Sequence, residues 1–212
     1  MKEWTRETLE EQIIGKVKAY TIPVNVKIEG KQRVLDMGEV ESMLRKAHTI
    51  SQTECGCRKM MGNCSPALEP GDGCIGINSS EEDIAKYGSR KVTLERALEG
   101  LRRTYDAGLV HMAYVFSGQE LPTLICSCCE CCCHSLGAAR KLGYKDHVFP
   151  SSLLASQQAN LCSACGACVD RCHFGARRIG DGSLEYSPEK CYGCGLCLDT
   201  CPSGAIGMVK RN

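Results

Sequence analysis

The most regular pattern of apolar and polar positions lies in residues 92–111, VTLERALEGLRRTYDAGLVH. The apolar positions recur at intervals of three and four residues, which predicts an amphipathic helix with one buried face. The apolar stripe consists of Leu94, Ala97, Leu98, Leu101 and Tyr105. Thr93 is suited to cap the start of this helix, and Gly108 fits the position just beyond its end.

Other segments complete the outline of a mixed fold. Residues 3–17 have helical periodicity, and so do residues 37–50. The apolar face of the second segment consists of Val40, Met43, Leu44 and Ala47. Residues 21–37 alternate like two strands joined at residues 29–31, and the apolar run at residues 109–116 predicts a short buried strand. We therefore expect an α+β fold, with helices and strands mixed in a cysteine-rich N-terminal domain.

The segment from Tyr144 to Leu161 is expected to connect this domain to a smaller one. Pro150 and the serines after it interrupt regular structure, and the apolar residues farther on can pack against the smaller domain. We place the boundary near residue 155, which gives domains at residues 1–155 and 156–212. A chain of 212 residues has room for one domain of ordinary size plus a small one.

Composition and charge narrow the classes of function. The chain has 26 Lys and Arg residues against 25 Asp and Glu residues, interspersed along its length. No basic stripe for binding nucleic acid is therefore expected. No apolar run approaches the roughly 20 residues that span a bilayer, and the first residues lack the apolar core of an export signal. We expect a cytoplasmic protein without a membrane span and without a nucleic-acid partner.

Cysteine changes this picture most. The chain has 18 cysteines and only 5% aromatic residues, and six of the cysteines lie within residues 126–133, CSCCECCC. Neighbouring cysteines are poor disulfide partners, because adjacent Cα atoms lie about 3.8 Å apart while a relaxed bridge needs about 4.4 to 6.8 Å. Crowded thiols in a reducing compartment indicate metal ligands. A core with so few aromatic side chains is also expected to depend on its metal to fold.

An internal repeat occupies residues 162–209. CSACGACVDRCHFGARRI is followed by CYGCGLCLDTCPSGAIGM, and each copy has the spacing C-x2-C-x2-C-x3-C. The first copy holds Cys162, Cys165, Cys168 and Cys172, and the second holds Cys191, Cys194, Cys197 and Cys201. Three cysteines at this spacing let a short loop wrap one iron-sulfur cube, and the fourth binds the other cluster. The fourth cysteine of each copy is also expected to open a helix.

The repeat resembles the bacterial two-cluster ferredoxins, a resemblance that covers about the last quarter of the chain. It implies a small βαββαβ domain that holds two [4Fe-4S] clusters. Carried onto this sequence, it implies one cluster on Cys162, Cys165, Cys168 and Cys201, and another on Cys191, Cys194, Cys197 and Cys172. The family's proline after the fourth cysteine is present as Pro202, but His173 replaces it in the first copy. A pair of zinc ribbons is the alternative, although zinc sites usually combine two separated knuckles.

Ten further cysteines lie upstream of the repeat. Cys55, Cys57, Cys64 and Cys74 come from a loop rich in glycine and proline, and Cys126, Cys128, Cys129, Cys131, Cys132 and Cys133 come from the CSCCECCC block. Glycine and proline allow the tight turns that wrapping a metal needs. Because a short peptide cannot surround a cluster alone, we expect the loop and the block to converge in space.

The upstream region resembles the cysteine-rich region that precedes two-cluster ferredoxin modules in redox proteins of anaerobes. The matching features are CGCR at residues 55–58, GLVH at residues 108–111 and CSCCECCC at residues 126–133. The resemblance implies iron-sulfur redox work, without naming a substrate or a reaction. Arg58 is placed to neutralise cluster charge, and His134 to bind a metal or carry a proton, although both residues also suit ordinary structural roles.

Several cofactor sets can use these ten cysteines. One ordinary cube would use four, and two cubes would use eight. Two non-cubane clusters like those of the heterodisulfide reductases would use five cysteines each, including the adjacent pairs Cys128-Cys129 and Cys132-Cys133. That family's Cys-Cys-Gly signature is absent, because Glu130 and His134 follow the two pairs. We expect one or two further iron-sulfur clusters, whose type the sequence does not specify, and the alternative is a structural zinc site with spare thiols.

Two functions fit this cofactor content. The first is an electron-transfer protein that relays single electrons to or from a redox partner enzyme. Residues 159–212 carry five acidic and six basic side chains, unlike the acidic surface common in free ferredoxins, which favours docking on a fixed partner. The second is an oxidoreductase whose N-terminal cluster reduces a disulfide, a corrinoid or another small molecule, with the ferredoxin domain as its wire. A substrate-sized pocket beside residues 126–133 would favour the second function.

Overall fold

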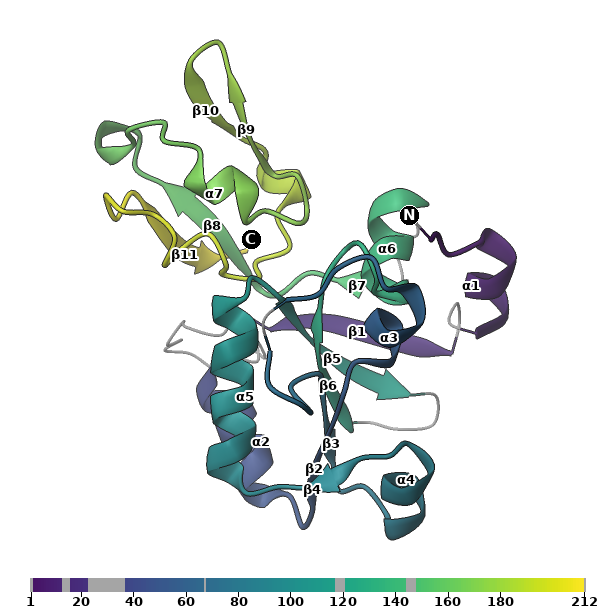
Figure 1. The fold of residues 1–212 in the computed structure, drawn as a ribbon. Helices are drawn as coiled ribbons and strands as arrows, with labels where there is room; N and C mark the ends of the chain where they lie inside the picture. The colour runs from purple at the N-terminus through teal and green to yellow at the C-terminus, as the bar shows by residue number, and fades with distance from the viewer. Residues whose placement is uncertain are drawn as a thin grey trace.

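The computed structural model describes residues 2–12, 16–22, 37–66, 68–116, 121–143 and 148–211. A seven-stranded sheet forms the centre of the N-terminal part, and two two-stranded sheets form the C-terminal part. The C-terminal part, green to yellow in Figure 1, lies at one end of the large sheet, beside the end of helix α5 (Leu94–Asp106).

The large sheet brings segments together that are far apart in the sequence. Its strand order is β4-β2-β3-β6-β5-β1-β7, antiparallel throughout except that β7 runs parallel to β1. The strands are β1 (Val17–Ile22), β2 (Ile50–Thr53), β3 (Cys74–Ile77), β4 (Arg90–Lys91), β5 (Val110–Phe116), β6 (Leu124–Cys128) and β7 (Val148–Phe149). The pairing of β3 with β6 places Cys74 opposite Cys126. A strand of the loop region thereby lies next to the start of the CSCCECCC block.

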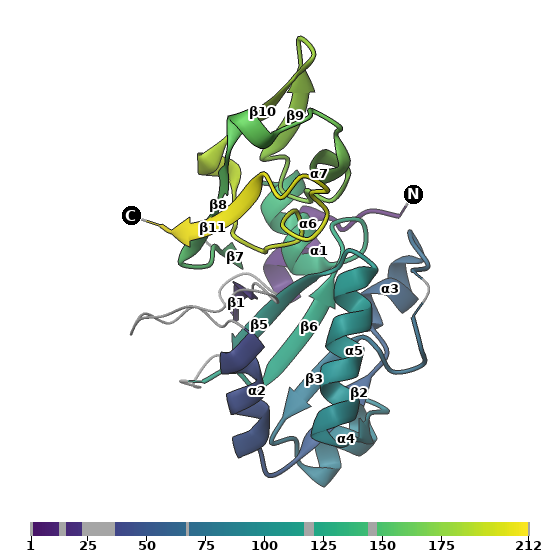
Figure 2. The ribbon, with the colours of Figure 1, turned by 90° about the vertical axis from the view of Figure 1, so that its left-hand side faces the viewer.

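Helices α2 (Met37–Lys46) and α5 cover one face of this sheet (Figure 2). The core between them and the sheet includes Val40, Leu44, Ala97, Leu101, Ile75 and Ile125. The predicted helix with the apolar stripe is confirmed as α5. Thr93 Oγ1 accepts a hydrogen bond from the Arg96 amide at 3.3 Å, and Gly108 has a φ of 83° just beyond the helix end. The helix predicted at residues 37–50 ends at Lys46, and Ile50 begins β2. Its predicted apolar face is confirmed, because Val40 and Leu44 lie in this core while Met43 and Ala47 pack against it.

The predicted helix at residues 3–17 is wrong in its extent. Helix α1 spans only Arg6–Gln12, and Val17 begins strand β1. The ladder from Val17 opposite Phe116 to Ile22 opposite His111 explains the difference, because pairing with β5 overrides a weak local helical preference. The buried strand predicted at residues 109–116 is confirmed as β5. The predicted turn at residues 29–31 and most of its two strands lie outside the described residues.

The opposite face of the sheet carries cysteine side chains and packs against helix α6 (His134–Lys141). Leu136 of α6 joins Met112, Cys126 and Cys128 in one buried cluster. The remaining short helices are α3 (Gly56–Met61) and α4 (Glu81–Lys86). Strand β6 is an element that the sequence pattern did not predict, and it turns the start of the cysteine block into part of the sheet.

The C-terminal part is built from short elements around the cysteine repeat. They are β8 (Leu153–Gln157), η2 (Ala159–Leu161), α7 (Ala167–Asp170), β9 (Arg177–Gly180), β10 (Ser183–Tyr186), η3 (Pro188–Lys190) and β11 (Ile206–Lys210). β8 pairs with β11, and β9 pairs with β10. Helix α7 ends before Cys172, and turns rather than helices follow Cys172 and Cys201, so the prediction that the fourth cysteine of each copy opens a helix is wrong for both copies. The boundary near residue 155 stays a prediction, and that position lies within β8.

Polar contacts join the two parts. Arg171 donates hydrogen bonds to the carbonyls of Asp106 and Tyr105, both at 3.0 Å, and the Tyr105 hydroxyl lies 2.9 Å from Asp199 Oδ2. His173 Nε2 lies 2.6 Å from the Gly108 carbonyl. These contacts fix the repeat against the end of α5. Across the described ranges, no helix has both the length and the apolar character needed to cross a membrane.

Candidate metal centres

The two cysteine loops of the repeat are shaped by residues with positive φ. Ala164 and Gly166 have φ values of 52° and 81°, and Gly193 and Gly195 have values of 70° and 81°. Left-handed backbone of this kind lets a short loop curl around one centre. At Gly193 a Cβ atom would lie only 2.2 Å from the Leu153 carbonyl oxygen. Glycine is therefore required there so that the second loop can pack against the start of β8.

The eight cysteines of the repeat surround two separate cavities. One cavity is lined by Cys162, Cys165, Cys168 and Cys201, and the other by Cys172, Cys191, Cys194 and Cys197. Each set takes three cysteines from one copy of the repeat and one from the other copy. The thiols of each set face a shared space, and neither set forms a tight group of sulfur atoms within 4.8 Å among the described residues. Four thiols around open space fit the chemistry of a [4Fe-4S] cluster, which takes four cysteine ligands.

A buried arginine stands between these sets, and the sequence analysis missed it. Arg177 is 3% exposed, its guanidinium carbon lies 4.5 Å from the centre of the Tyr186 ring, and it donates to Gln157 Oε1 at 3.1 Å. Burial raises the pKa of Cys197 to about 11, and the Arg177 charge acts in the opposite direction. Arg177 occupies the place that Ile206 has in the second copy. The signal in the sequence is that one copy of the repeat has a charged residue at a position where the other copy has an apolar one.

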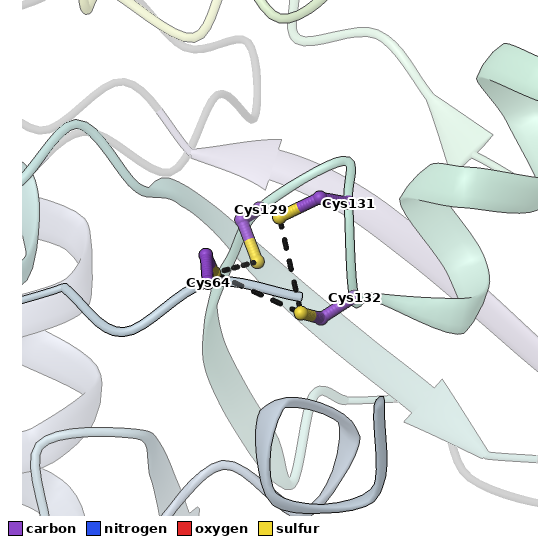
Figure 3. Close-up of side chains that lie close together, drawn as sticks. All are labelled: Cys64, Cys129, Cys131 and Cys132. Atoms are coloured by element: carbon purple, nitrogen blue, oxygen red, sulfur yellow. Dashed lines mark hydrogen bonds between the residues drawn. The ribbon is translucent and has the colours of Figure 1, made fainter. Parts of the chain in front are cut away.

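The ten upstream cysteines divide into two groups, of which the smaller has four members. Cys64 follows helix α3, and Cys129, Cys131 and Cys132 lie on the turn after β6, with their sulfur atoms pointing toward one another (Figure 3). Their Sγ atoms all lie within 4.8 Å of one another, a geometry that could hold a metal ion. We call these residues the four-thiol group.

Hydrogen bonds from neighbouring side chains hold the backbone of the four-thiol group. Asn63 Nδ2 donates to the Cys131 carbonyl at 2.8 Å, and Trp4 Nε1 donates to the Cys132 carbonyl at 2.9 Å. Met61 and Leu109 pack beside the sulfur atoms in the same buried cluster. The N-terminal segment therefore covers this group, a contact that sequence spacing did not reveal.

The larger group has six members. Its members are Cys55, Cys57, Cys74, Cys126, Cys128 and Cys133, which we call the six-thiol ring. Cys74 Sγ lies 3.0 Å from Cys126 Sγ across the β3–β6 pairing. Cys126 and Cys128 share one face of β6, because side chains two apart in a strand point the same way. Side-chain interactions then continue from Cys128 to Cys133, to Cys57, to Cys55 and back to Cys74.

The division separates each adjacent pair of cysteines. Cys128 and Cys133 belong to the six-thiol ring, whereas Cys129 and Cys132 belong to the four-thiol group. Two clusters of five cysteines, each holding an adjacent pair, do not match this arrangement. The loop and the block converge in space as expected, but they do so at two places.

The thiols of the six-thiol ring differ in how firmly they hold their protons, which matters for metal binding because ligating cysteines must be thiolates. Interactions with Cys57 and Cys74 lower the pKa of Cys55 to about 2. Interactions with Cys126 and Cys133 lower the pKa of Cys128 to about 7. Interactions with neighbouring thiols, together with burial, raise the pKa values of the other four members, Cys57, Cys74, Cys126 and Cys133. Metal binding would have to release the protons of these thiols.

Three other side chains surround the ring. Arg58 donates to the Ser127 carbonyl at 2.8 Å, and although burial lowers its pKa, interactions with the neighbouring cysteines Cys55, Cys129 and Cys128 give a net increase. His134 Nδ1 lies 3.1 Å from Cys57 Sγ. The Tyr114 hydroxyl lies 3.7 Å from the Sγ atoms of both Cys128 and Cys133, and burial raises the pKa of Tyr114 well above its usual value. Tyr114 therefore stays a neutral hydroxyl beside the sulfur atoms, and sequence reasoning did not single it out.

A cavity of about 410 Å³ opens beside the four-thiol group. It is lined by Cys131, Glu130 and Lys141 on one side and by Lys2 and Trp4 of the N-terminal segment on the other. Its size is within the range of small-molecule sites. It borders one sulfur atom of the four-thiol group and does not reach the six-thiol ring.

Comparison with known proteins agrees with the geometry of the repeat. A family model described as a 4Fe-4S dicluster domain matches residues 161–205, and no curated protein matches the chain. Two 4Fe-4S clusters are thereby implied for the C-terminal part. The chain combines a 4Fe-4S dicluster ferredoxin domain at residues 161–205 with an N-terminal α/β part in which four cysteines could hold a metal.

Proposed function

We propose that this protein is an iron-sulfur electron-transfer protein that relays single electrons to or from a redox partner enzyme. The observation that carries the proposal is the pair of cavities in the repeat, each lined by four thiols drawn from both copies. Bound [4Fe-4S] clusters exchange single electrons at potentials set by charge, hydrogen bonds and exposure. The chain contributes the ligands, the apolar packing and the fixed charge of Arg177.

The ligand sets of this proposal follow the two cavities. Cys162, Cys165, Cys168 and Cys201 hold one cluster, and Cys172, Cys191, Cys194 and Cys197 hold the other, in a domain of the βαββαβ type. Of the first set, Cys165 is exposed, so that this cysteine reaches the surface. A redox partner protein or enzyme subunit docks there in this proposal, on a surface of nearly balanced charge, and a cytoplasmic location belongs to the same proposal.

The second cavity faces the N-terminal part. Its cysteines Cys172 and Cys194 pack against the buried cluster that contains Cys126, Cys128 and Cys133. Phe174 and Tyr192 stack in this region with ring centres 4.3 Å apart. Continuous packing from the repeat to the six-thiol ring supports a relay that includes one or two further iron-sulfur clusters in the N-terminal domain.

The cavity beside Cys131 supports a second candidate function, reduction of a disulfide, a corrinoid or another small molecule at the N-terminal site. The cavity has the size of a ligand site, and Lys2 and Lys141 at its edge suit an anionic group. Against this candidate, four cysteines complete the coordination of a tetrahedral ion, so that no ligand position stays open. The relay is therefore the function that the geometry supports better.

The test uses full-length protein purified without oxygen. Iron and sulfide analysis should exceed the about eight iron atoms of two [4Fe-4S] clusters, and reduction should give paramagnetic resonance signals that a one-electron acceptor removes. Protein with only those eight irons, and with all upstream thiols open to alkylation, would contradict the N-terminal clusters. Repeated turnover of an added disulfide that Cys131→Ser abolishes, while the C-terminal clusters of that variant still exchange electrons with a one-electron acceptor, would establish the second candidate instead.

A further inference from the structure

The distances within the four-thiol group match one metal ion. Cys64 Sγ lies 3.4 Å from Cys129 Sγ and 3.7 Å from Cys132 Sγ, and Cys131 Sγ lies 3.8 Å from Cys132 Sγ. Four sulfur atoms at about 2.3 Å from a tetrahedral zinc ion are about 3.8 Å apart. These three distances are thus close to this value and all six lie within 4.8 Å, a spacing compatible with a single tetrahedral ion.

The repeat gives an internal comparison for this geometry. In a cube each thiolate binds a different iron atom, so the four sulfur atoms lie farther apart than they do around one ion. The two cavities of the repeat have this open form, and among the described residues only the four-thiol group brings four ligand atoms within 4.8 Å. The same chain thus contains thiols arranged in two distinct ways.

The six-thiol ring has more ligands than one ion can use. A tetrahedral ion takes four thiolates, which would leave two thiols buried next to a metal without a role. The ring is closed by neighbour-to-neighbour interactions, from Cys74 through Cys126 and onward, and it is not one tight group within 4.8 Å. A centre with several metal atoms bridged by sulfide can use this many thiolates.

The four-thiol group and the six-thiol ring also differ in the residues that surround them. The six-thiol ring shares a buried cluster with Cys172 and Cys194 of the repeat. The four-thiol group lies in another cluster with Met61 and Trp4, and that cluster contains no residue of the repeat. The charge of Arg58 lies between the groups, where it interacts with Cys55 and Cys128 on one side and Cys129 on the other.

We infer that the ten upstream cysteines form two separate metal sites of different kinds. The four-thiol group binds one zinc ion in a closed, structural site. The six-thiol ring binds an iron-sulfur centre with more than one iron atom. The inference deepens the proposed relay and rests on it, because it assigns the N-terminal iron to the six-thiol ring alone. The four-thiol site then has a structural role and holds the N-terminal segment in place.

A matched pair of variants tests this division. Cys64→Ser and Cys74→Ser change the same atom at two places in one loop, and both side chains are partly exposed. In full-length protein purified without oxygen, Cys64→Ser should lose the single zinc and keep all of its iron. Cys74→Ser should keep the zinc and fall to the iron of the two C-terminal clusters, about eight atoms. Loss of the same metal from both variants would overturn the inference.

A measurement on the unaltered protein keeps the test independent of folding defects. X-ray absorption at the zinc edge should show four sulfur neighbours at about 2.3 Å. Absence of zinc, or zinc with nitrogen or oxygen neighbours, would also overturn the inference. Failure of the relay itself has another signature, since it would leave these metal contents unchanged while the reduced protein fails to pass electrons to an acceptor.

Discussion

At the scale of single residues, the chain places charge and hydrogen bonds where thiols crowd together. Arg58 and Arg177 are cations close to sulfur atoms in two different parts of the molecule. A buried cation beside several thiolates reduces their mutual repulsion and is one of the means by which a protein sets a cluster potential. Spacing in the sequence pointed to Arg58, which follows Cys57, but not to Arg177, whose role depends on how β9 packs.

The crossed ligand sets give the first prediction. Cys172→Ser should release the cluster held by Cys191, Cys194 and Cys197, because Cys172 lines the same cavity as these residues. Alkylation followed by mass spectrometry should find those three thiols reactive, with about half of the C-terminal iron lost.

The reciprocal variant is the control for this experiment. Cys201→Ser should expose Cys162, Cys165 and Cys168 and leave the second set protected. If Cys172→Ser instead exposed Cys162, Cys165 and Cys168, the ligand sets would follow the sequence and the crossing would be wrong.

His111 gives a second prediction, which concerns stability against pH. It is 1% exposed, its Nε2 lies 2.9 Å from Thr104 Oγ1, and burial lowers its pKa to about 3. The unfolded chain binds a proton near pH 6.5 while the folded chain does not, so stability is full above that pH and falls as the pH drops from about 6.5 toward 3. From pH 7 to pH 5 the loss should be about 2 kcal/mol.

The control variant is His111→Gln. Its side-chain amide can still donate a hydrogen bond to Thr104, but it has no proton to gain or lose in this pH range. Denaturant unfolding at pH 7 and pH 5 should show that the variant lacks the part of the pH dependence due to His111. Equal pH dependence in both proteins would mean that His111 is protonated in the folded state.

At the scale of elements, helix α5 anchors the cysteine loop. Asp72, with a fully buried side chain, pairs with Arg96 Nη1 at 2.8 Å and with Arg103 Nε at 2.6 Å, both from α5. One residue farther on, Gly73 allows close approach, since a Cβ there would lie 2.3 Å from the Cys55 amide nitrogen. The loop that carries Cys74 is therefore fixed both to the helix and to the segment that carries Cys55.

Removal of this anchor is the third prediction. Asp72→Ala leaves two arginines without their buried acceptor and should lower the free energy of unfolding by about 3 kcal/mol. Chemical denaturation measures this loss. The exposed ion pair between Glu81 and Lys91 supplies the control, because Glu81→Ala should change stability little. Equal losses in the two variants would show that Asp72 does not anchor the loop.

Some of these elements could be predicted from the sequence alone, and others could not. The stripe of α5 and its cap follow from local spacing, and the repeat suggests its ligand sets because the spacing of its cysteines is regular. Strand β6 could not be foreseen, since a block with six cysteines in eight positions shows no alternation of apolar and polar residues. The division of the upstream thiols depends on β3 lying beside β6, a pairing between residues about fifty positions apart.

At the scale of the whole molecule, the repeat is docked on the end of α5. Arg171 donates to two carbonyls at that helix end, where the negative end of the helix dipole favours a cation. The aromatic pair of Phe174 and Tyr192 packs in the same interface region. The relay in the proposed function needs this docking to be rigid.

Docking gives the fourth prediction. Arg171→Ala removes two hydrogen bonds between the parts and should weaken the interface by about 1 to 3 kcal/mol. Limited proteolysis should then cut faster near residues 149–153, with the metal content unchanged. Arg178→Ala is the control, because Arg178 is exposed and pairs with Glu185 within the repeat. Unchanged cleavage in Arg171→Ala would mean that other contacts suffice.

The separation of neighbouring cysteines has a consequence for how this chain can change. Cys128 and Cys129 face different sulfur groups, and so do Cys132 and Cys133, so that one short segment separates the two sites and supplies cysteines to both. Adding or removing one residue in this segment would change which cysteines face the four-thiol group and which face the six-thiol ring, and both sites would change at once. The length of the segment between Cys126 and Cys133 is therefore as constrained as the identity of its side chains.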